Sequence, residues 1–240
     1  MKLRVLPLIV FFIFSCGANA EEINIGNIMQ ALGPFLEGKP ANTRCKEYLA
    51  RANEINGITL LYAFAHCSRE ASLVEAAFLL NASNIRLSVE QEYFVPAPSE
   101  TASMSMLNGV RRLYTTHVGK DEVFRDEQLY KALIAMIKSW KPTVSSSFSP
   151  GWATSAEPPP AVVIDRIEKA KDTTLVLLDE WAFLLQDDEF FRAKIDMEKF
   201  MKLHPTYKAG SEIEKEFVRL KNAFDNKLIQ LRAKRSVPNP

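Results

Sequence analysis

The chain has 240 residues, 47% of them apolar, and its 30 basic side chains nearly balance 29 acidic ones. This apolar content is that of a globular protein and excludes general disorder. The near-neutral charge lacks the basic surplus that phosphate binding requires, so we expect no nucleic-acid partner.

The first twenty residues have the pattern of a cleaved export signal. Lys2 and Arg4 precede an apolar run over residues 5–14, and the small-x-small pattern of residues 18–20 follows. The run is too short to span a bilayer, which takes about 20 residues. We therefore predict that residues 1–20 are a signal peptide, that the mature chain has no transmembrane segment, and that it is a periplasmic or secreted protein starting at Glu21.

Cys16 allows a second interpretation of this segment, because residues 13–16 loosely match a lipoprotein cleavage box. Phe14 is bulky where that box has a smaller side chain, and the Ala18-Asn19-Ala20 site lies directly downstream. Export as a free protein is therefore favoured over lipid anchoring through Cys16. Cleavage would remove two basic residues and leave 28 basic and 29 acidic ones, a formal charge of −1.

Only Cys45 and Cys67 remain after cleavage, in a compartment where thiols oxidise. They are spaced equally about the turn-forming dipeptide Asn56-Gly57, with helical sequence expected over residues 45–55 and 59–67. Antiparallel helices about that turn bring the cysteines within the Cα spacing of about 4.4–6.8 Å that a disulfide needs. We predict an αα-hairpin stapled by a Cys45–Cys67 disulfide.

Apolar residues recur at helical spacing along most of the remaining chain. Gly33-Pro34 is expected to end the first helix, and residues 95–98 to end the helix that reaches Phe94. Asp126 is a predicted N-cap. Outside the hairpin, helices are expected over residues 24–32, 72–94, 103–117, 126–140, 162–185, 189–203 and 211–235.

Residues 141–160 form the clearest boundary, since they contain a serine triplet, a Pro-Gly pair and a proline triplet without any periodic pattern. Loops of this length are uncommon inside a compact domain. The predicted fold is all-α. Residues 21–140 are expected to form a multi-helix array that contains the stapled hairpin, and residues 141–160 a Pro/Ser-rich linker or loop. Residues 161–240 are expected to form a three-helix segment. Whether the two helical parts share one core is open at this stage.

The sequence contains no recognised catalytic or metal-binding motif. His66, His117 and His204 have no metal-ligand spacing, and no Gly-x-Ser-x-Gly elbow occurs. Both mature cysteines are assigned to the disulfide. We therefore predict no cofactor and no metal, and a non-enzymatic role is favoured over an enzymatic one. The acidic pair Asp187-Asp188 is interpreted as the end of one helix and the cap of the next.

Four polar residues stand within one predicted helix. Asn84 and Gln91 interrupt its apolar stripe, where they either bond a neighbouring helix or line a pocket, and packing is the preferred interpretation. Arg86 and Glu90, four residues apart, are predicted to form a surface ion pair.

Phe148 and Trp152 lie in the linker, which carries only one charged residue between positions 142 and 160. Aromatic side chains in a loop either pack on the core, the preferred interpretation, or remain available as anchors for a partner. These two residues are the candidate interaction site of the chain.

The chain combines an export signal, cysteine-stapled helices and no catalytic motif. In this it is similar to many small periplasmic helical proteins, including immunity-type inhibitors of secreted toxins. The likeness concerns architecture and assigns no residue. The leading hypothesis is a protein-binding module, inhibitory or immunity-like, that binds another protein in the extracytoplasmic space. The alternatives are an envelope hydrolase with paired carboxylates on different helices and a small-ligand carrier with a pocket between helices.

Overall fold

The computed structural model describes residues 23–37, 45–68, 71–117, 121–155, 158–204, 206 and 208–236. Within these ranges the chain forms ten α-helices, a short 3-10 helix over Pro98–Glu100 and no strand, so the all-α prediction is confirmed. The expected signal peptide, Cys16 and Glu21 lie outside the described residues. The helices are α1 (Ile25–Glu37), α2 (Cys45–Ala50), α3 (Gly57–Cys67), α4 (Leu73–Tyr93), α5 (Thr101–His117), α6 (Asp121–Arg125), α7 (Glu127–Ser139), α8 (Pro160–Leu185), α9 (Asp188–Leu203) and α10 (Glu212–Ser236).

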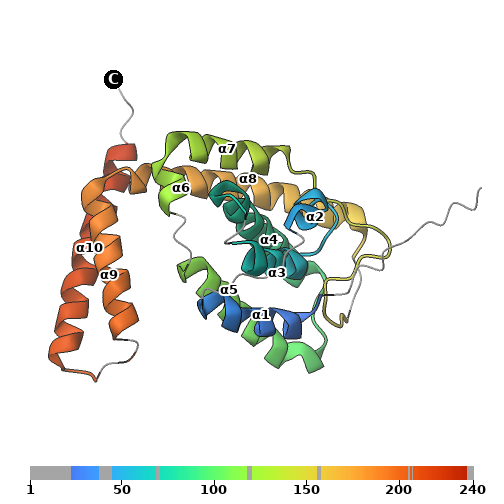
Figure 1. Cartoon of the computed structure of the whole chain (residues 1–240), viewed down its shortest axis with the longest axis horizontal. Helices are drawn as coiled ribbons and strands as arrows, with labels where there is room; N and C mark the ends of the chain where they lie inside the picture. Colours follow the sequence, from blue (N-terminus) through green and yellow to red (C-terminus); the bar gives the residue numbers. More distant parts are fainter. Residues whose placement is uncertain are drawn as a thin grey trace, which may run out of the picture.

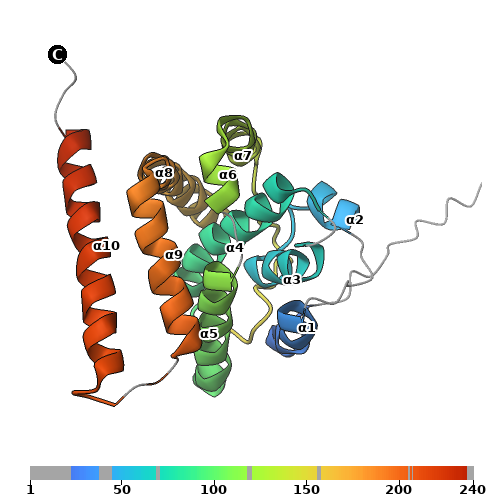
Figure 2. The same cartoon turned by 60° about the vertical axis from the view of Figure 1, so that its left-hand side comes forward.

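The fold is built around α4, which is buried on nearly all sides. Thirteen of its 21 residues are buried, so it lacks the single apolar face of a surface helix. Helices α3, α7 and α8 pack directly against it, and α1 lies on α3 and contacts α5. Figures 1 and 2 show α7 and α8 on one side of α4, with α1 and α5 on the other.

The predicted disulfide is present and joins the first residue of α2 to the last residue of α3, with a Cα–Cα distance of 5.5 Å between Cys45 and Cys67. Helix α2 is shorter than predicted, because Asn56 begins α3 instead of lying at the centre of the turn. Its side-chain oxygen accepts the Thr59 N–H at 2.7 Å, and residues 51–55 form the turn. The disulfide therefore closes a compact α2–α3 corner.

Helix α1 continues through Gly33-Pro34, so the predicted end at this dipeptide is wrong. The Phe35 ring packs against the rings of Tyr114 and Phe64, with centroid distances of 4.6 and 5.9 Å. Pro34 itself is exposed. The aromatic contacts hold the last turn of α1 in place although proline removes one backbone donor.

Helices α8, α9 and α10 match the three helices predicted for the C-terminal segment. Helix α8 packs on α4 and α7 and places Val163, Ile167 and Leu178 in the same core as α3 and α4. Helices α9 and α10 form a hairpin at the end of α8 and pack mainly on each other (Figure 2). The helical parts before and after the linker thus share one core through α8.

The segment over residues 141–155 contains no helix, as its composition predicts, but it is bonded to the body of the protein. The Thr143 N–H donates to the carbonyl of Asn53 at 2.7 Å, and the Ala97 N–H donates to the carbonyl of Ala153 at 2.9 Å. The segment is therefore a packed loop that returns across the α2–α3 corner.

Candidate functional site

An open groove of 460 Å³ lies between the α2–α3 corner and the loop over residues 145–149. One wall comes from α2, the turn after it and the first turns of α3, and the loop forms the other wall. Most of the lining side chains are polar. Those that matter below are Tyr48, Arg51, Thr59, Tyr62, Ser147 and Phe148.

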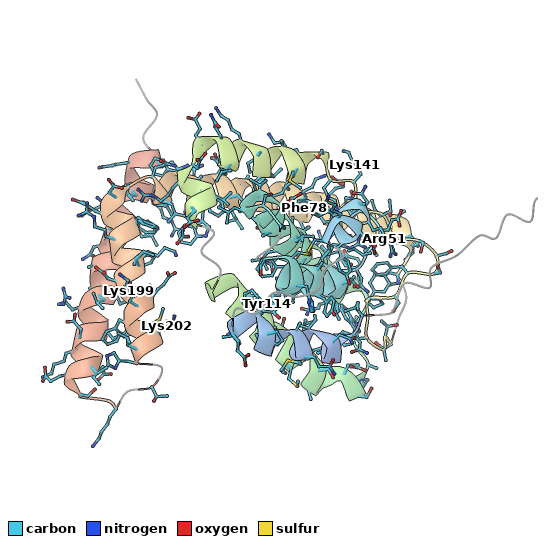
Figure 3. The ribbon with its side chains drawn as sticks, in the orientation of Figure 1. Arg51, Phe78, Tyr114, Lys141, Lys199 and Lys202 are labelled. Carbon is cyan, nitrogen blue, oxygen red and sulfur yellow. A yellow bond between two sulfur atoms is a disulfide. The ribbon has the colours of Figure 1, made fainter. Side chains whose placement is uncertain are left out.

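The helical wall, formed by α2, the turn after it and α3, presents aromatic and polar side chains. Tyr48 lies on α2 and Arg51 begins the turn that follows it, whereas Thr59 and Tyr62 are three residues apart on α3 and so share one face. The Tyr48 and Tyr62 rings meet edge to face at 6.3 Å. Because the disulfide ties α2 to α3, this wall is held rigidly. Figure 3 labels Arg51 at this corner.

Hydrogen bonds fix the conformation of the loop wall. The Asn56 side-chain amide donates to the Ser149 carbonyl at 2.8 Å, and the Phe148 N–H donates to the Ser145 carbonyl at 3.1 Å. Gly151 has a φ of +88°, in the left-handed region that favours glycine, and a Cβ there would lie 3.1 Å from the Ile23 carbonyl oxygen. These contacts therefore hold the loop wall in one conformation before a ligand binds.

Phe148 contributes an aromatic ring that packs against neighbouring side chains. Its ring lies 5.1 Å from the Phe94 ring, and the Arg86 guanidinium carbon lies 5.1 Å from the Phe148 ring centroid. Phe148 is half-buried and lines the groove. The structure therefore places this predicted interaction residue at an accessible wall.

The charged pair beneath Phe148 is buried, so the prediction of a surface ion pair is wrong. The side chains of Arg86 and Glu90 are both 0% exposed, and Arg86 Nε donates to Glu90 Oε1 at 2.6 Å. The other Arg86 nitrogens donate to the carbonyls of Asn53 and Thr143, both at 3.2 Å, and Glu90 Oε2 accepts the Gly57 N–H at 2.8 Å. Burial raises the pKa of Glu90, against the opposing effects of Arg86 and the Gly57 N–H. One network thus ties α3, α4, the turn and the loop together.

Trp152, the second predicted interaction residue, lies in the core. Its side chain is 8% exposed, and its indole N–H donates to the Phe94 carbonyl at 2.8 Å. A buried indole with a satisfied donor supports the loop from inside and offers no surface to a partner in this conformation. Of the two predicted residues, only Phe148 lies in the groove.

Sequence reasoning missed the residues of the helical wall. Tyr48, Arg51 and Tyr62 belong to no motif, but all three lie between the two cysteines of the predicted disulfide. Tyrosine and arginine are enriched at protein interfaces, so these residue types within the stapled segment were the available signal.

The polar residues of the α4 stripe hold helices together. Asn84 Oδ1 accepts the Arg111 Nε hydrogen at 2.7 Å, and the Gln91 amide donates to Asn108 Oδ1 at 3.4 Å. Both contacts attach α5 to α4. The packing interpretation is confirmed, and neither residue lines the groove.

The remaining candidates are the three histidines and Asp187. His66 is half-buried, its ring lies 4.1 Å from that of Tyr62, and burial lowers its pKa. Asp187 caps α9 by accepting the Phe190 N–H at 2.9 Å, as predicted. His204 follows the last residue of α9. The His117 side chain lies outside the described part of the chain.

Comparisons with protein-family models, curated protein sequences and solved structures find no significant match to this chain. Among the described helices, none is both long and apolar enough to cross a membrane. The described part of the chain also contains no group of three or more histidine, cysteine or acidic side chains positioned to hold a metal ion.

Proposed function

We propose that the protein is an exported helical binding module whose groove receives a segment of another protein outside the cytoplasm. The observation that carries this proposal is a preorganised wall of tyrosine, serine and arginine side chains. These residue types dominate engineered and natural protein-recognition surfaces, because tyrosine supplies rigid amphipathic area and serine supplies adaptable hydrogen bonds. A groove held by a disulfide and a buried ion pair also loses little freedom on binding.

The location outside the cytoplasm rests on the signal pattern of residues 1–20 and agrees with the disulfide, which persists in oxidising compartments. N-terminal sequencing of the protein recovered from its native host tests it. We expect Glu21 as the first residue. An acylated Cys16 at the N-terminus would instead show a lipid-anchored protein.

Site-specific photo-crosslinking tests the groove. A photoreactive phenylalanine at Ser147, an exposed groove residue, is compared with the same substitution at Thr173, an exposed residue of α8 outside the groove. We expect an adduct of one defined mass at Ser147 in living cells and none at Thr173. Equal adducts at both positions, or none at Ser147, would contradict the proposal.

Two substitutions measure the contribution of the helical wall. Arg51→Ala and Tyr62→Ala should each reduce the yield of the Ser147 adduct about tenfold, as expected for interface residues whose truncation costs more than about 1 kcal/mol. Arg192→Ala, at an exposed position on α9, is the matched control and should leave the yield unchanged. If the bound protein is a secreted toxin, this binding would act as inhibition or immunity.

The hydrolase alternative has one observation in its favour, since Glu47 and Glu54 line the same groove. Glu47 and Glu54 are both exposed. A carboxylic acid that donates a proton near neutral pH is usually buried, so their exposure argues against this role. Glu47→Gln and Glu54→Gln distinguish the two functions. Binding should survive both changes, whereas a carboxylate hydrolase would lose turnover with either.

A further inference from the structure

A second hollow, of 410 Å³, lies where α6 and α7 meet the end of α8 and the last turns of α10. Figure 1 shows these four helix ends converging at the opposite side of the molecule from the α2–α3 corner. The hollow shares no lining residue with the groove. Its walls combine three aromatic rings with two carboxylates, from Phe124, Tyr130, Phe183, Glu127 and Asp179.

The protein places one of its own guanidinium groups in this hollow. The Arg235 guanidinium carbon lies 5.6 Å from the centroid of the Phe183 ring, and Nη2 pairs with the Asp179 carboxylate. The Tyr130 hydroxyl lies 3.5 Å from the other Asp179 oxygen. A cation above an aromatic face with a carboxylate at its edge is a favourable setting for guanidinium. Arg235 therefore shows which chemical group the hollow accommodates.

Arg235 is held loosely enough to be exchanged. Its side chain is 35% exposed and that of Asp179 is 63% exposed, so water screens the pair. Exposed ion pairs of this kind contribute little to stability. Once Arg235 moves aside, a guanidinium from another molecule can form the same contacts with Phe183 and Asp179.

One wall of the hollow is held by contacts that do not involve Arg235. The Gln186 side-chain amide joins the end of α8 to α6 by donating to the Phe124 carbonyl at 2.9 Å. The Phe124 and Tyr130 rings contact each other at 6.1 Å. Burial, reinforced by Asp179, raises the pKa of Tyr130, which keeps its hydroxyl a neutral donor beside the carboxylate. The wall formed by Phe124 and Tyr130 therefore persists when Arg235 leaves.

We propose that this hollow is a binding site for a guanidinium group of another molecule, and that Arg235 is an intramolecular occupant which the ligand displaces. The guanidinium belongs either to an arginine side chain of a partner protein or to a free small cation. Both sources use the same contacts with Phe183, Tyr130 and Asp179.

Titration calorimetry with N-acetyl-arginine amide tests the proposal on the full mature chain. Arg235→Gln vacates the hollow, and we expect it to bind this probe about two- to sixfold more tightly than wild type, because a loosely held internal occupant lowers the apparent affinity only by the fraction of sites that it fills. Arg232→Gln is the matched control, since Arg232 lies three residues earlier on α10 and pairs with Glu180 at 2.7 Å outside the hollow. Its affinity should equal that of wild type.

Two further comparisons establish the chemistry. N-acetyl-citrulline amide, the neutral isostere, should not bind to Arg235→Gln, and Asp179→Asn in the same background should abolish binding of the arginine probe. Circular dichroism checks the fold, and Arg235→Ala repeats the comparison if Arg235→Gln is unfolded. Equal affinity of wild type and both Arg235 variants, or equal binding of the citrulline probe, would overturn the proposal.

The source of the guanidinium is distinguished by size. A site for a partner side chain binds the blocked tripeptide Gly-Arg-Gly at least as well as methylguanidinium, whereas a small-cation site binds methylguanidinium and excludes the tripeptide. Either result supports a guanidinium site. Failure here leaves the Ser147 adduct unaffected, because the two sites share no residue.

Discussion

At Gly57, α3 approaches α4 closely. A Cβ at this position would lie 2.7 Å from Leu87 Cγ and 2.9 Å from the Leu87 backbone nitrogen. Its N–H also donates to the buried Glu90 carboxylate. The missing side chain therefore allows both the helix packing and the ion-pair network beneath the groove.

Alanine substitutions at two glycines should have opposite effects. Gly57→Ala should lower the free energy of unfolding by about 1–3 kcal/mol, because the added methyl group forces α3 away from α4. Gly109→Ala, in the middle of α5, should raise it by about 0.5–1 kcal/mol, since that site is exposed and no atom lies within 4 Å of the new Cβ. Urea unfolding measures both. Equal effects would contradict the close packing at Gly57.

Trp152→Ala separates the structural role of the linker from an interface role. We expect a loss of about 3–5 kcal/mol of unfolding free energy, because the change empties a buried indole site and leaves the Phe94 carbonyl without its donor. Ser147→Ala in the same loop should change stability by less than about 0.5 kcal/mol. A Trp152 variant of wild-type stability with weakened partner binding would restore the interface role of this residue.

At the scale of elements, a half-buried lysine attaches α9 to α6. Lys194 Nζ lies 2.6 Å from Asp121 at the start of α6 and 2.6 Å from Glu198 on its own helix. Burial disfavours the charged lysine, but the hydrogen bonds to both carboxylates outweigh this effect and raise the pKa of Lys194. The ion pair between Lys194 and Asp121 therefore adds a polar contact that attaches α9 to the rest of the molecule.

Lys194→Met should destabilise the protein by about 1.5–3 kcal/mol at neutral pH, the usual range for hydrogen bonds to charged groups. Because the pKa of Lys194 is raised in the folded state, its contribution is complete below the usual lysine pKa of 10.5 and is lost as the pH rises through the higher folded value. The difference in Tm between wild type and variant should thus be constant from pH 7 to 9 and shrink above pH 10.5.

Lys131→Met is the control for this effect. Lys131 and Glu127 form an ion pair within one helix at 2.5 Å, but their side chains are 71% and 77% exposed. Such an exposed pair contributes little to stability. A Lys131 variant as unstable as the Lys194 variant would mean that general charge loss, and not the link between α9 and α6, explains the result.

Across the whole molecule, burial is distributed unevenly. Eight of the eleven residues of α3 are buried. Among the described residues, α9 buries only Phe190 and α10 only Leu231. The α9–α10 hairpin is held by ring contacts such as Phe190 with Phe224 at 5.0 Å. Figure 3 shows the labelled Lys199 and Lys202 on this hairpin, away from the labelled Phe78 of the core.

Native-state hydrogen exchange should follow this distribution. Amides of α9 and α10 are expected to exchange through local openings at least about 2 kcal/mol easier than global unfolding, because few apolar contacts must be broken. Amides of α3 and α4 should exchange only with global unfolding. Protection of α9 and α10 equal to that of α3 would show that the hairpin unfolds together with the core.

Local sequence signals determined the disulfide and most of the helices of this protein. Ser72 begins α4 because its hydroxyl accepts the Glu75 N–H while the Glu75 carboxylate accepts the Ser72 N–H, a contact within one turn. Asp126 caps α7 in a similar way. The cysteines meet because two short helices must reverse between them. In each case the interacting groups lie close along the chain, so residue type and spacing are sufficient.

Tertiary structure decided the features that depend on distant neighbours. Arg86 and Glu90 have the spacing of a surface pair, and only the return of the loop at Thr143 and the approach of Gly57 bury them. Phe148 and Trp152 have the same local character, yet one lines the groove and the other is enclosed. The physical reason is that burial is a property of the surrounding elements, and the free energy of a side chain in its final position depends on contacts that its own sequence neighbourhood does not contain.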